Sequence, residues 1–264
     1  MNLLSNKRLL GTATVVLAGF LQTAYAASSA HAQIDWNSLQ VQYFDLSGDT
    51  NTPILSWSNE SGEVHTHAHT GPNAYQNDYD DQWAYDFVTA LSASAVTSEA
   101  QSNSLRDANT LSASASTQPG NWNNGYWNHA RAWSENTVNF TLNGLGIALI
   151  SLNWSTSVNG TLSDWSNRAS SEVYISASYW DNNTTNGDVT TNFGAYTIDD
   201  GNFYYANTFT LALFSNGINP VQGNLKTAVF ASSISEVSQI PVPAAFWMMG
   251  SALLGLLGVS RRKT

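Results

Sequence analysis

The chain has 264 residues, of which 42% are hydrophobic and only 11% are charged, and it contains no cysteine. The lack of cysteine excludes disulfides, Cys-ligated zinc, iron–sulfur clusters and cysteine nucleophiles. Residues 27–240 hold all 19 acidic residues but only four of the nine basic ones, hence a net charge of −15, and this field repels nucleic acid.

The N-terminus predicts a secretory signal peptide over residues 1–26. A basic pair precedes a mostly apolar run over residues 9–21, which is too short for a comfortable membrane span. Ala24 and Ala26 then supply the small side chains that signal peptidase accepts, so we expect cleavage after Ala26. A later cut near Ala30 or Ala32 and an uncleaved anchor are the alternatives.

The middle of the chain, residues 27–234, is expected to form an all-β domain, a jelly-roll-like β-sandwich. Its short apolar runs alternate with polar residues, as in Val138, Phe140 and Leu142, which is the period of a half-buried strand. Asn-Gly pairs suited to hairpin turns lie between the runs. The clearest expected strands are Thr137–Leu142, Ile147–Trp154, Glu172–Trp180, Phe203–Phe214 and Leu225–Ala231, and the expected turns include Asn143-Gly144, Asn186-Gly187 and Asn216-Gly217.

Residues 82–117 give a less clear pattern. The sequence Leu-Ser-Ala-Ser-Ala occurs at residues 91–95 and again at residues 111–115, and its alternation favours two strands with a face of small side chains. The composition of residues 95–108 also fits a helix, which is the alternative.

Three histidines alternate at His65, His67 and His69. In a strand all three imidazoles project from one face, and neutral imidazole binds zinc, copper or nickel. The pattern makes these residues a candidate metal site, of a metal-binding protein or a metal-dependent enzyme. An ordinary polar, exposed strand is the alternative.

Two other segments suggest ligands. Asp181, Asn183 and Asp188 lie in an oxygen-rich stretch that is a candidate calcium site, although Asp, Asn and Gly are also what turns require. Trp122, Tyr126 and Trp127 lie among asparagines and a glycine, a composition that suits stacking on sugar rings. Burial of these rings in a core is the alternative for the second group.

Sequence motifs of catalysis are missing. The chain has no Gly-x-Ser-x-Gly elbow, no glycine-rich phosphate loop and no His-Glu-x-x-His pair. We therefore expect no enzyme activity, with the reservation that paired carboxylates of a glycosidase are a spatial and not a sequential feature.

The C-terminus has three features in a fixed order, after an expected linker over residues 235–240. Pro241 and Pro243 flank Val242 and keep the segment extended. Residues 244–259 carry no charge and would form a helix of about 24 Å, slightly short of the hydrocarbon core. A basic tail follows, which the positive-inside rule keeps in the cytoplasm: Arg261, Arg262 and Lys263.

These residues, 241–264, closely resemble the PEP-CTERM sorting signal of exported proteins of Gram-negative bacteria, in a variant with Val242 where the family motif has Glu. The resemblance implies a substrate of an exosortase, cut near the Pro-x-Pro and passed from the inner membrane to the cell surface or the extracellular matrix. It also implies association with exopolysaccharide or biofilm. An ordinary C-terminal membrane anchor is the alternative to a sorting signal, and a carbohydrate-binding module is an alternative for the domain.

Overall fold

The structure is a computed structural model that describes residues 28–48, 52–71, 76–86, 89–118, 127–160, 167–181, 186–196 and 201–236. Its regular structure over these ranges is β alone, which confirms the all-β prediction. No helix within these ranges is long and apolar enough to cross a membrane. The predicted signal peptide and the predicted sorting tail, with Pro241, Val242, Pro243, Arg261, Arg262 and Lys263, lie outside the described residues.

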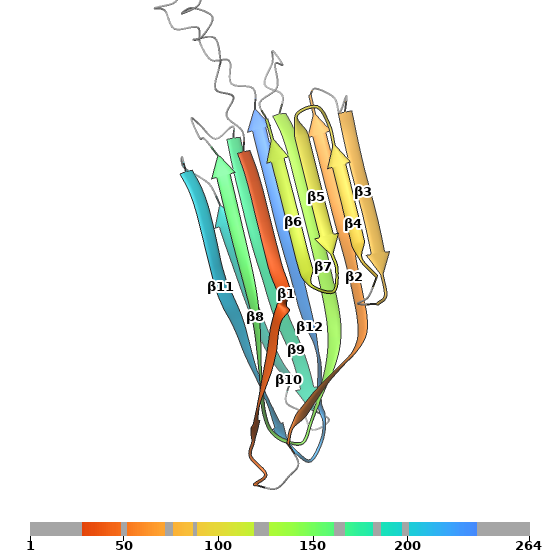
Figure 1. The fold of residues 1–264 in the computed structure, drawn as a ribbon, viewed down its shortest axis with the longest axis vertical. Coiled ribbons are helices and arrows are strands. Elements are labelled where there is room, and N and C mark those ends of the chain that lie inside the picture. Colours follow the sequence, from red (N-terminus) through yellow and green to blue (C-terminus); the bar gives the residue numbers. More distant parts are fainter. Residues whose placement is uncertain are drawn as a thin grey trace, which may run out of the picture.

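The described residues form twelve strands in two antiparallel sheets that face each other (Figure 1). Sheet A has the order β11-β8-β1-β6-β5-β4, and sheet B has the order β10-β9-β12-β7-β2-β3. The strands are β1 (Ser28–Asp45), β2 (Ile54–Thr70), β3 (Gln76–Ala84), β4 (Leu91–Val96), β5 (Ala100–Arg106), β6 (Thr110–Thr117), β7 (Trp127–Asn143), β8 (Leu145–Gly160), β9 (Asn167–Asp181), β10 (Asn186–Tyr196), β11 (Gly201–Asn216) and β12 (Val221–Glu236).

The apolar alternation read from the sequence marks the side of each strand that faces the core. Val138, Phe140 and Leu142 of β7 are all buried between the sheets. Every second residue of β4, β5, β6 and β8 is buried in the same way. Because one face of each sheet is buried, a shift of register by one residue would expose the whole apolar set, so the pattern fixes the register.

The end of the sandwich that contains β4, β5 and β6 has a core of small side chains. Both copies of the Leu-Ser-Ala-Ser-Ala sequence form strands with buried alanines, and β5 occupies the segment for which a helix was the alternative. The sheets come close enough for Ser102 Oγ to donate to the carbonyl of His67 at 3.1 Å. Ser134 Oγ donates in the opposite direction, to the carbonyl of Leu105 at 3.0 Å.

Two glycines with positive φ lie at the tip of the sandwich where β7 ends and β8 begins. Gly144 has φ of 89° between β7 and β8, and Gly217 has φ of 76° after β11, as expected for two of the predicted turns. The third predicted turn is wrong, because Asn186 and Gly187 are the first residues of β10 and pair with Trp180 and Tyr179 of β9.

One charged side chain lies inside the sandwich. Arg106 is 1% exposed, and its guanidinium donates to Asn136 Oδ1 and to the carbonyls of Thr89 and Asp86. A Cβ atom at Gly62 would come within 2.1 Å of Arg106 Nε. Glycine at this position therefore makes room for the buried cation, whose hydrogen bonds offset the cost of removing it from water.

Hydroxyl groups of both sheets meet at the end of the sandwich where β1 begins and β12 ends (Figure 1). Ser28 Oγ lies 2.6 Å from Ser233 Oγ and 3.4 Å from Ser235 Oγ. Thr117 Oγ1 lies 2.7 Å from each of the same two serine oxygens. Ser235 is buried in this cluster, so the predicted linker starts later than residue 235. The two ends of the domain thus lie side by side.

Candidate functional site

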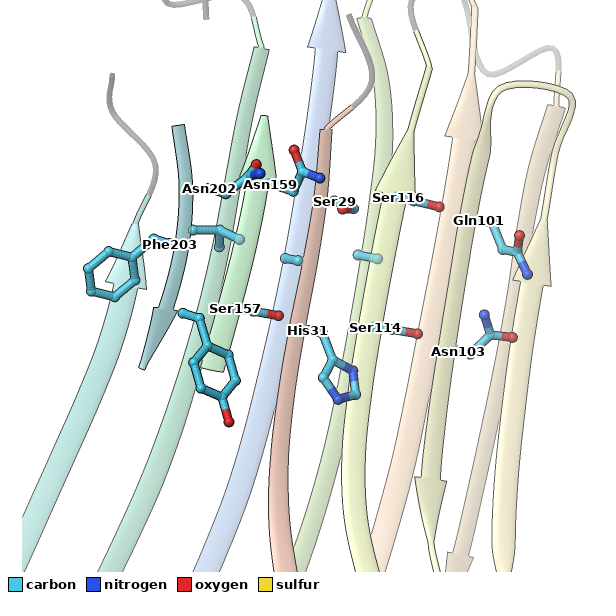
Figure 2. Close-up of a pocket in the computed structure, with 14 residues that line it drawn as sticks. Ser29, His31, Gln101, Asn103, Ser114, Ser116, Ser157, Asn159, Asn202 and Phe203 are labelled. Atoms are coloured by element: carbon cyan, nitrogen blue, oxygen red, sulfur yellow. The ribbon is translucent and has the colours of Figure 1, made fainter. Parts of the chain in front are cut away.

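A shallow groove with a volume of about 580 Å³ crosses the outer face of sheet A, close to the end where β1 begins (Figure 2). Its side chains come from β11, β8, β1, β6 and β5, in that spatial order. Its polar side chains and Tyr204 belong to the residues of each strand that point away from the core, since successive residues of a strand face opposite sides. The remaining lining residues are Ala30, Ala115, Val158 and Phe203, which belong to the core-facing side of their strands. None of the 14 lining residues is Asp, Glu, Lys or Arg.

The strand register arranges the groove in two rows that run across five strands. One row contains Tyr204, Ser157, His31, Ser114 and Asn103, each directly opposite the next. The other row contains Asn202, Asn159, Ser29, Ser116 and Gln101, again in direct register. With neighbouring strands about 4.8 Å apart, each row extends over roughly 20 Å. An extended chain of sugars lying across the strands would contact all five of them.

The chemistry of the two rows suits a ligand with many hydroxyl groups. Amides and hydroxyls of Asn, Gln and Ser both donate and accept hydrogen bonds. Tyr204 adds a flat ring that is 71% exposed, and it also borders a second hollow of about 460 Å³ along the same face. The second hollow contributes Gln33, Asn153 and Thr208, and its one charged residue is Asp35. Together the hollows form a polar, nearly uncharged surface next to an exposed aromatic ring.

Trp127, predicted to contact glycan, begins β7 on the other sheet. Its side chain is 48% exposed, and its ring stacks on His129 with the centroids 5.8 Å apart and the planes at 24°. One face of the indole is therefore covered by the imidazole. Trp122 and Tyr126, the other two residues of that prediction, lie outside the described residues.

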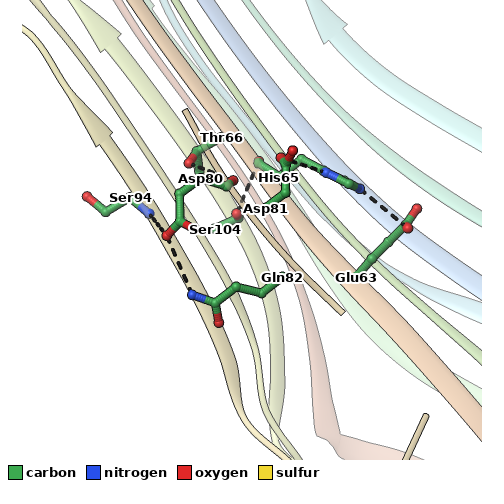
Figure 3. Close-up of polar contacts among 8 residues, drawn as sticks. All are labelled: Glu63, His65, Thr66, Asp80, Asp81, Gln82, Ser94 and Ser104. Atoms are coloured by element: carbon green, nitrogen blue, oxygen red, sulfur yellow. Dashed lines mark hydrogen bonds and ion pairs between the residues drawn. The ribbon is translucent and has the colours of Figure 1, made fainter. Parts of the chain in front are cut away.

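The three alternating histidines lie on the outer face of sheet B, where strand periodicity predicts them. All three are half-buried, while Thr66 and Ala68 between them are buried. His65 Nδ1 donates to Asp81 Oδ1 of β3 at 2.9 Å, and its Nε2 lies 3.4 Å from Glu63 Oε2 (Figure 3). His67 Nε2 donates to Asn77 Oδ1. Two of the imidazoles are thus already held by neighbouring polar side chains.

The electrostatics of His65 follow from these neighbours. Partial burial alone lowers the pKa of His65, but the hydrogen bond to Asp81 and the negative charges of Glu63 and Asp81 outweigh burial. The net result is a pKa above the ordinary 6.5, so the imidazolium form is favoured.

His129 joins the predicted histidines and was not found from the sequence. It lies directly opposite His69, and its ring centroid is 6.0 Å from that of His67. Burial, together with the smaller effect of the positive charges of Arg131, His67 and His69, lowers the pKa of His129 to about 4. No local pattern marks His129, because sixty residues separate it in the chain from its neighbour His69.

The structure does not gather these residues around a single point. Within the described ranges, no group of three or more His, Asp or Glu side chains is arranged to hold a metal ion. Of the predicted calcium ligands, Asn183 lies outside the described residues. Asp181 and Asp188 lie in the backbone of β9 and β10, and their side chains are outside what the structure describes.

No family model matches the chain, and neither does any curated protein. Among solved structures, the chain is weakly similar to the 7S globulin of Momordica charantia, with 9% identity, coverage of 79% of this chain and 84% of that chain, and a TM-score of 0.14. It is also weakly similar to the vicilin of Capsicum annuum, with 8% identity, coverage of 85% and 78%, and a TM-score of 0.13.

Proposed function

We propose that the chain is an exported protein of the cell surface or extracellular matrix, whose β-sandwich binds neutral polysaccharide in the groove on sheet A. One observation carries the proposal: two rows of amides and hydroxyls, with His31 at the centre of one row, cross five strands beside the exposed ring of Tyr204 and include no Asp, Glu, Lys or Arg. Sugars are recognised by hydrogen bonds to their hydroxyl groups and by stacking on aromatic rings.

The charge of the groove distinguishes neutral from acidic polysaccharides. Binding a row of carboxylates or sulfates requires Arg or Lys donors, and neither type lines either hollow. The negative charge of the remaining domain would also repel a polyanion. The groove therefore fits an uncharged chain of sugars.

The route to the surface rests on the two ends of the sequence. The signal peptide over residues 1–26 would direct export through the inner membrane of a Gram-negative bacterium. The PEP-CTERM-like tail would then hold the protein by a membrane helix until an exosortase processes it. Contact between Ser28 and Ser235 means that both signals attach at one end of the sandwich, which supports a domain held by that end with its two faces accessible.

The proposal includes a jelly-roll-like arrangement of the strands. The chain passes repeatedly between the sheets, for example from β1 to β2, from β6 to β7 and from β10 to β11. Such crossing connections are typical of antiparallel double-sheet folds, in which the outer faces are free to bind ligands.

Co-sedimentation of the full chain, in detergent, with the producing organism's own extracellular polysaccharide tests the function. We expect the chain to sediment with the neutral fraction, and equally with and without calcium, since the lining of the two hollows holds a single carboxylate. Tyr204→Ala should weaken binding roughly tenfold, because it removes one stacking ring.

The matched control is Tyr79→Ala, which removes a tyrosine that is 70% exposed on sheet B. It should bind like the unaltered chain. Absence of sedimentation, or equal losses in both variants, would contradict a site in this groove. A strict calcium requirement would instead move the site to the segment of Asp181, Asn183 and Asp188.

A further inference from the structure

Among the described residues, strand β11 is a long edge strand with no strand paired to its second side. It pairs with β8 along its whole length, from Gly201 to Asn216, and it is the last strand of sheet A (Figure 1). At about 3.3 Å per residue, its 16 residues make an edge of roughly 50 Å. An edge strand presents unpaired N–H and C=O groups, which another strand can use.

The opposite side of the sandwich shows how this chain closes an edge. Backbone N–H groups of edge strand β4 and the residue Ser98 that follows it donate to side chains of β3 in the other sheet (Figure 3 shows the bond to Asp80). The four bonds run from Ser92 to Gln82, from Ser94 to Asp80, from Val96 to Asp78 and from Ser98 to Gln76, at distances between 2.8 and 3.4 Å. This ladder satisfies β4 and places two carboxylates along its edge, which disfavours pairing with another chain.

Strand β11 has none of these protective features. Its 16 residues include no charged residue and no proline, although the domain carries a net charge of −15. Four of its aromatic side chains are strongly exposed: Phe203, Tyr204, Tyr205 and Phe214. A long, uncharged, aromatic edge is the feature that promotes strand-to-strand association.

The backbone groups of β11 that point away from β8 belong to its even-numbered residues. The N–H of Thr208 donates to the adjacent Asn207 Oδ1 at 2.7 Å, and the N–H of its partner on β8, Asn153, donates to Ser38 Oγ on the other side. Thr208 therefore directs its backbone N–H and C=O away from β8. Because residues of an antiparallel pair alternate between hydrogen-bonded and non-hydrogen-bonded positions, the other even-numbered residues of β11 do the same.

We propose that β11 pairs antiparallel with β11 of a second copy of this chain, which joins two six-stranded sheets around a two-fold axis at Phe209. This register uses the whole strand and brings opposite one another the even-numbered residues, whose backbone groups point away from β8. At Thr208 the N–H would exchange Asn207 Oδ1 for an acceptor on the partner strand. It places Tyr204 opposite Phe214, Ala206 opposite Ala212, and Thr208 opposite Thr210 of the partner copy.

The strand sequence is self-complementary in this register. Aromatic side chains face aromatic side chains, and small residues face small residues. β-branched residues also face each other, and these are favourable cross-strand combinations. Two acidic domains can approach here because β11 carries no charged residue, so that no like charges meet along the strand. The partner is therefore a second copy rather than a basic protein, for which the edge offers no anionic group.

The absence of native cysteine allows a direct test by crosslinking. In the double variant Thr208→Cys, Thr210→Cys each new thiol faces its opposite member in the partner, at a Cα separation suited to a disulfide. After mild oxidation of the full chain, we expect a covalent dimer on a denaturing gel. The control Ser155→Cys, Ser157→Cys has the same spacing on the same outer face, but on the interior strand β8, and should run as an uncrosslinked monomer on the denaturing gel.

A second test introduces a positive charge at the proposed interface and needs no cysteine. Thr210→Lys, on the exposed side of β11, should weaken dimerisation of the full chain roughly tenfold in light scattering, since the register places the two lysines as diagonal neighbours across the two-fold axis. Ser94→Lys, on the closed edge strand β4, should leave the mass unchanged. A monomeric mass, a dimer without the β11 crosslink, or equal crosslinking in the β8 control would overturn the proposal.

Discussion

The two outer faces of the sandwich are built from similar antiparallel strands but differ in charge. On sheet A, rows of Ser, Asn and Gln cross five strands with no Asp, Glu, Lys or Arg among the groove residues. On sheet B, one row contains Asp81, His65, Trp133, Phe230 and Glu172, and the next has Glu63 directly opposite Glu135. The comparison separates a face suited to uncharged hydroxyl groups from a face that responds to pH.

The largest expected effect concerns His129 on sheet B. Its pKa of about 4 in the folded protein lies below the unfolded value of 6.5, so folding holds the imidazole neutral. The contribution to stability is complete above pH 6.5 and is lost as the pH falls towards 4, by roughly 3 kcal/mol in total. His129→Gln should remove this part of the acid sensitivity, as measured by chemical unfolding at pH 7 and pH 4.

His31→Gln on sheet A provides the control, because it retains His129 and should retain the loss between the two pH values. If His129→Gln loses as much stability on acidification as the unaltered chain, burial does not hold this imidazole neutral. The distinction between a neutral face and a titrating face would then lose its main support.

A charge introduced on sheet A should have an intermediate effect. Ser157 lies in the middle of one groove row, directly opposite His31 and Tyr204. Ser157→Asp would place a carboxylate under a bound neutral sugar, which costs hydration without a compensating partner. We expect roughly tenfold weaker binding to the neutral polysaccharide fraction at pH 8.

Ser176→Asp is the matched control, since Ser176 is half-buried on the outer face of sheet B. It adds the same charge to the molecule but should leave polysaccharide binding unchanged. An equal loss in both variants would attribute the effect to net charge instead of to the groove.

Local pattern predicted the central parts of β7, β8, β9, β11 and β12 and the shared face of His65, His67 and His69, because both depend on alternation within one strand. It did not mark β1, β3 or β10 as strands. The same rule found the buried alanines of β4 and β6. It could not find the groove rows. Tyr204, Ser157, His31 and Ser114 come from four distant strands, and their alignment depends on strand order and register, which short-range sequence patterns leave undetermined.

The smallest expected effect concerns the ion pair of His65 on sheet B. Because its folded pKa is raised, the pair stabilises the fold below pH 6.5 and loses its effect as the pH rises through the folded pKa. Both side chains are more than a third exposed, so solvent limits the contribution to less than about 1 kcal/mol. Asp81→Asn should lower the pKa of His65 in a proton NMR titration and reduce stability at pH 5 but not at pH 9.

Glu63→Gln tests whether this assignment of causes is correct. Glu63 Oε2 lies 3.4 Å from His65 Nε2, whereas Asp81 Oδ1 accepts a hydrogen bond from Nδ1 at 2.9 Å. Because the shorter, hydrogen-bonded contact stabilises the imidazolium more, Glu63→Gln should lower the pKa of His65 by less than Asp81→Asn does. The opposite order would show that the charge of Glu63 on the same strand, and not the hydrogen bond between β2 and β3, controls protonation of His65.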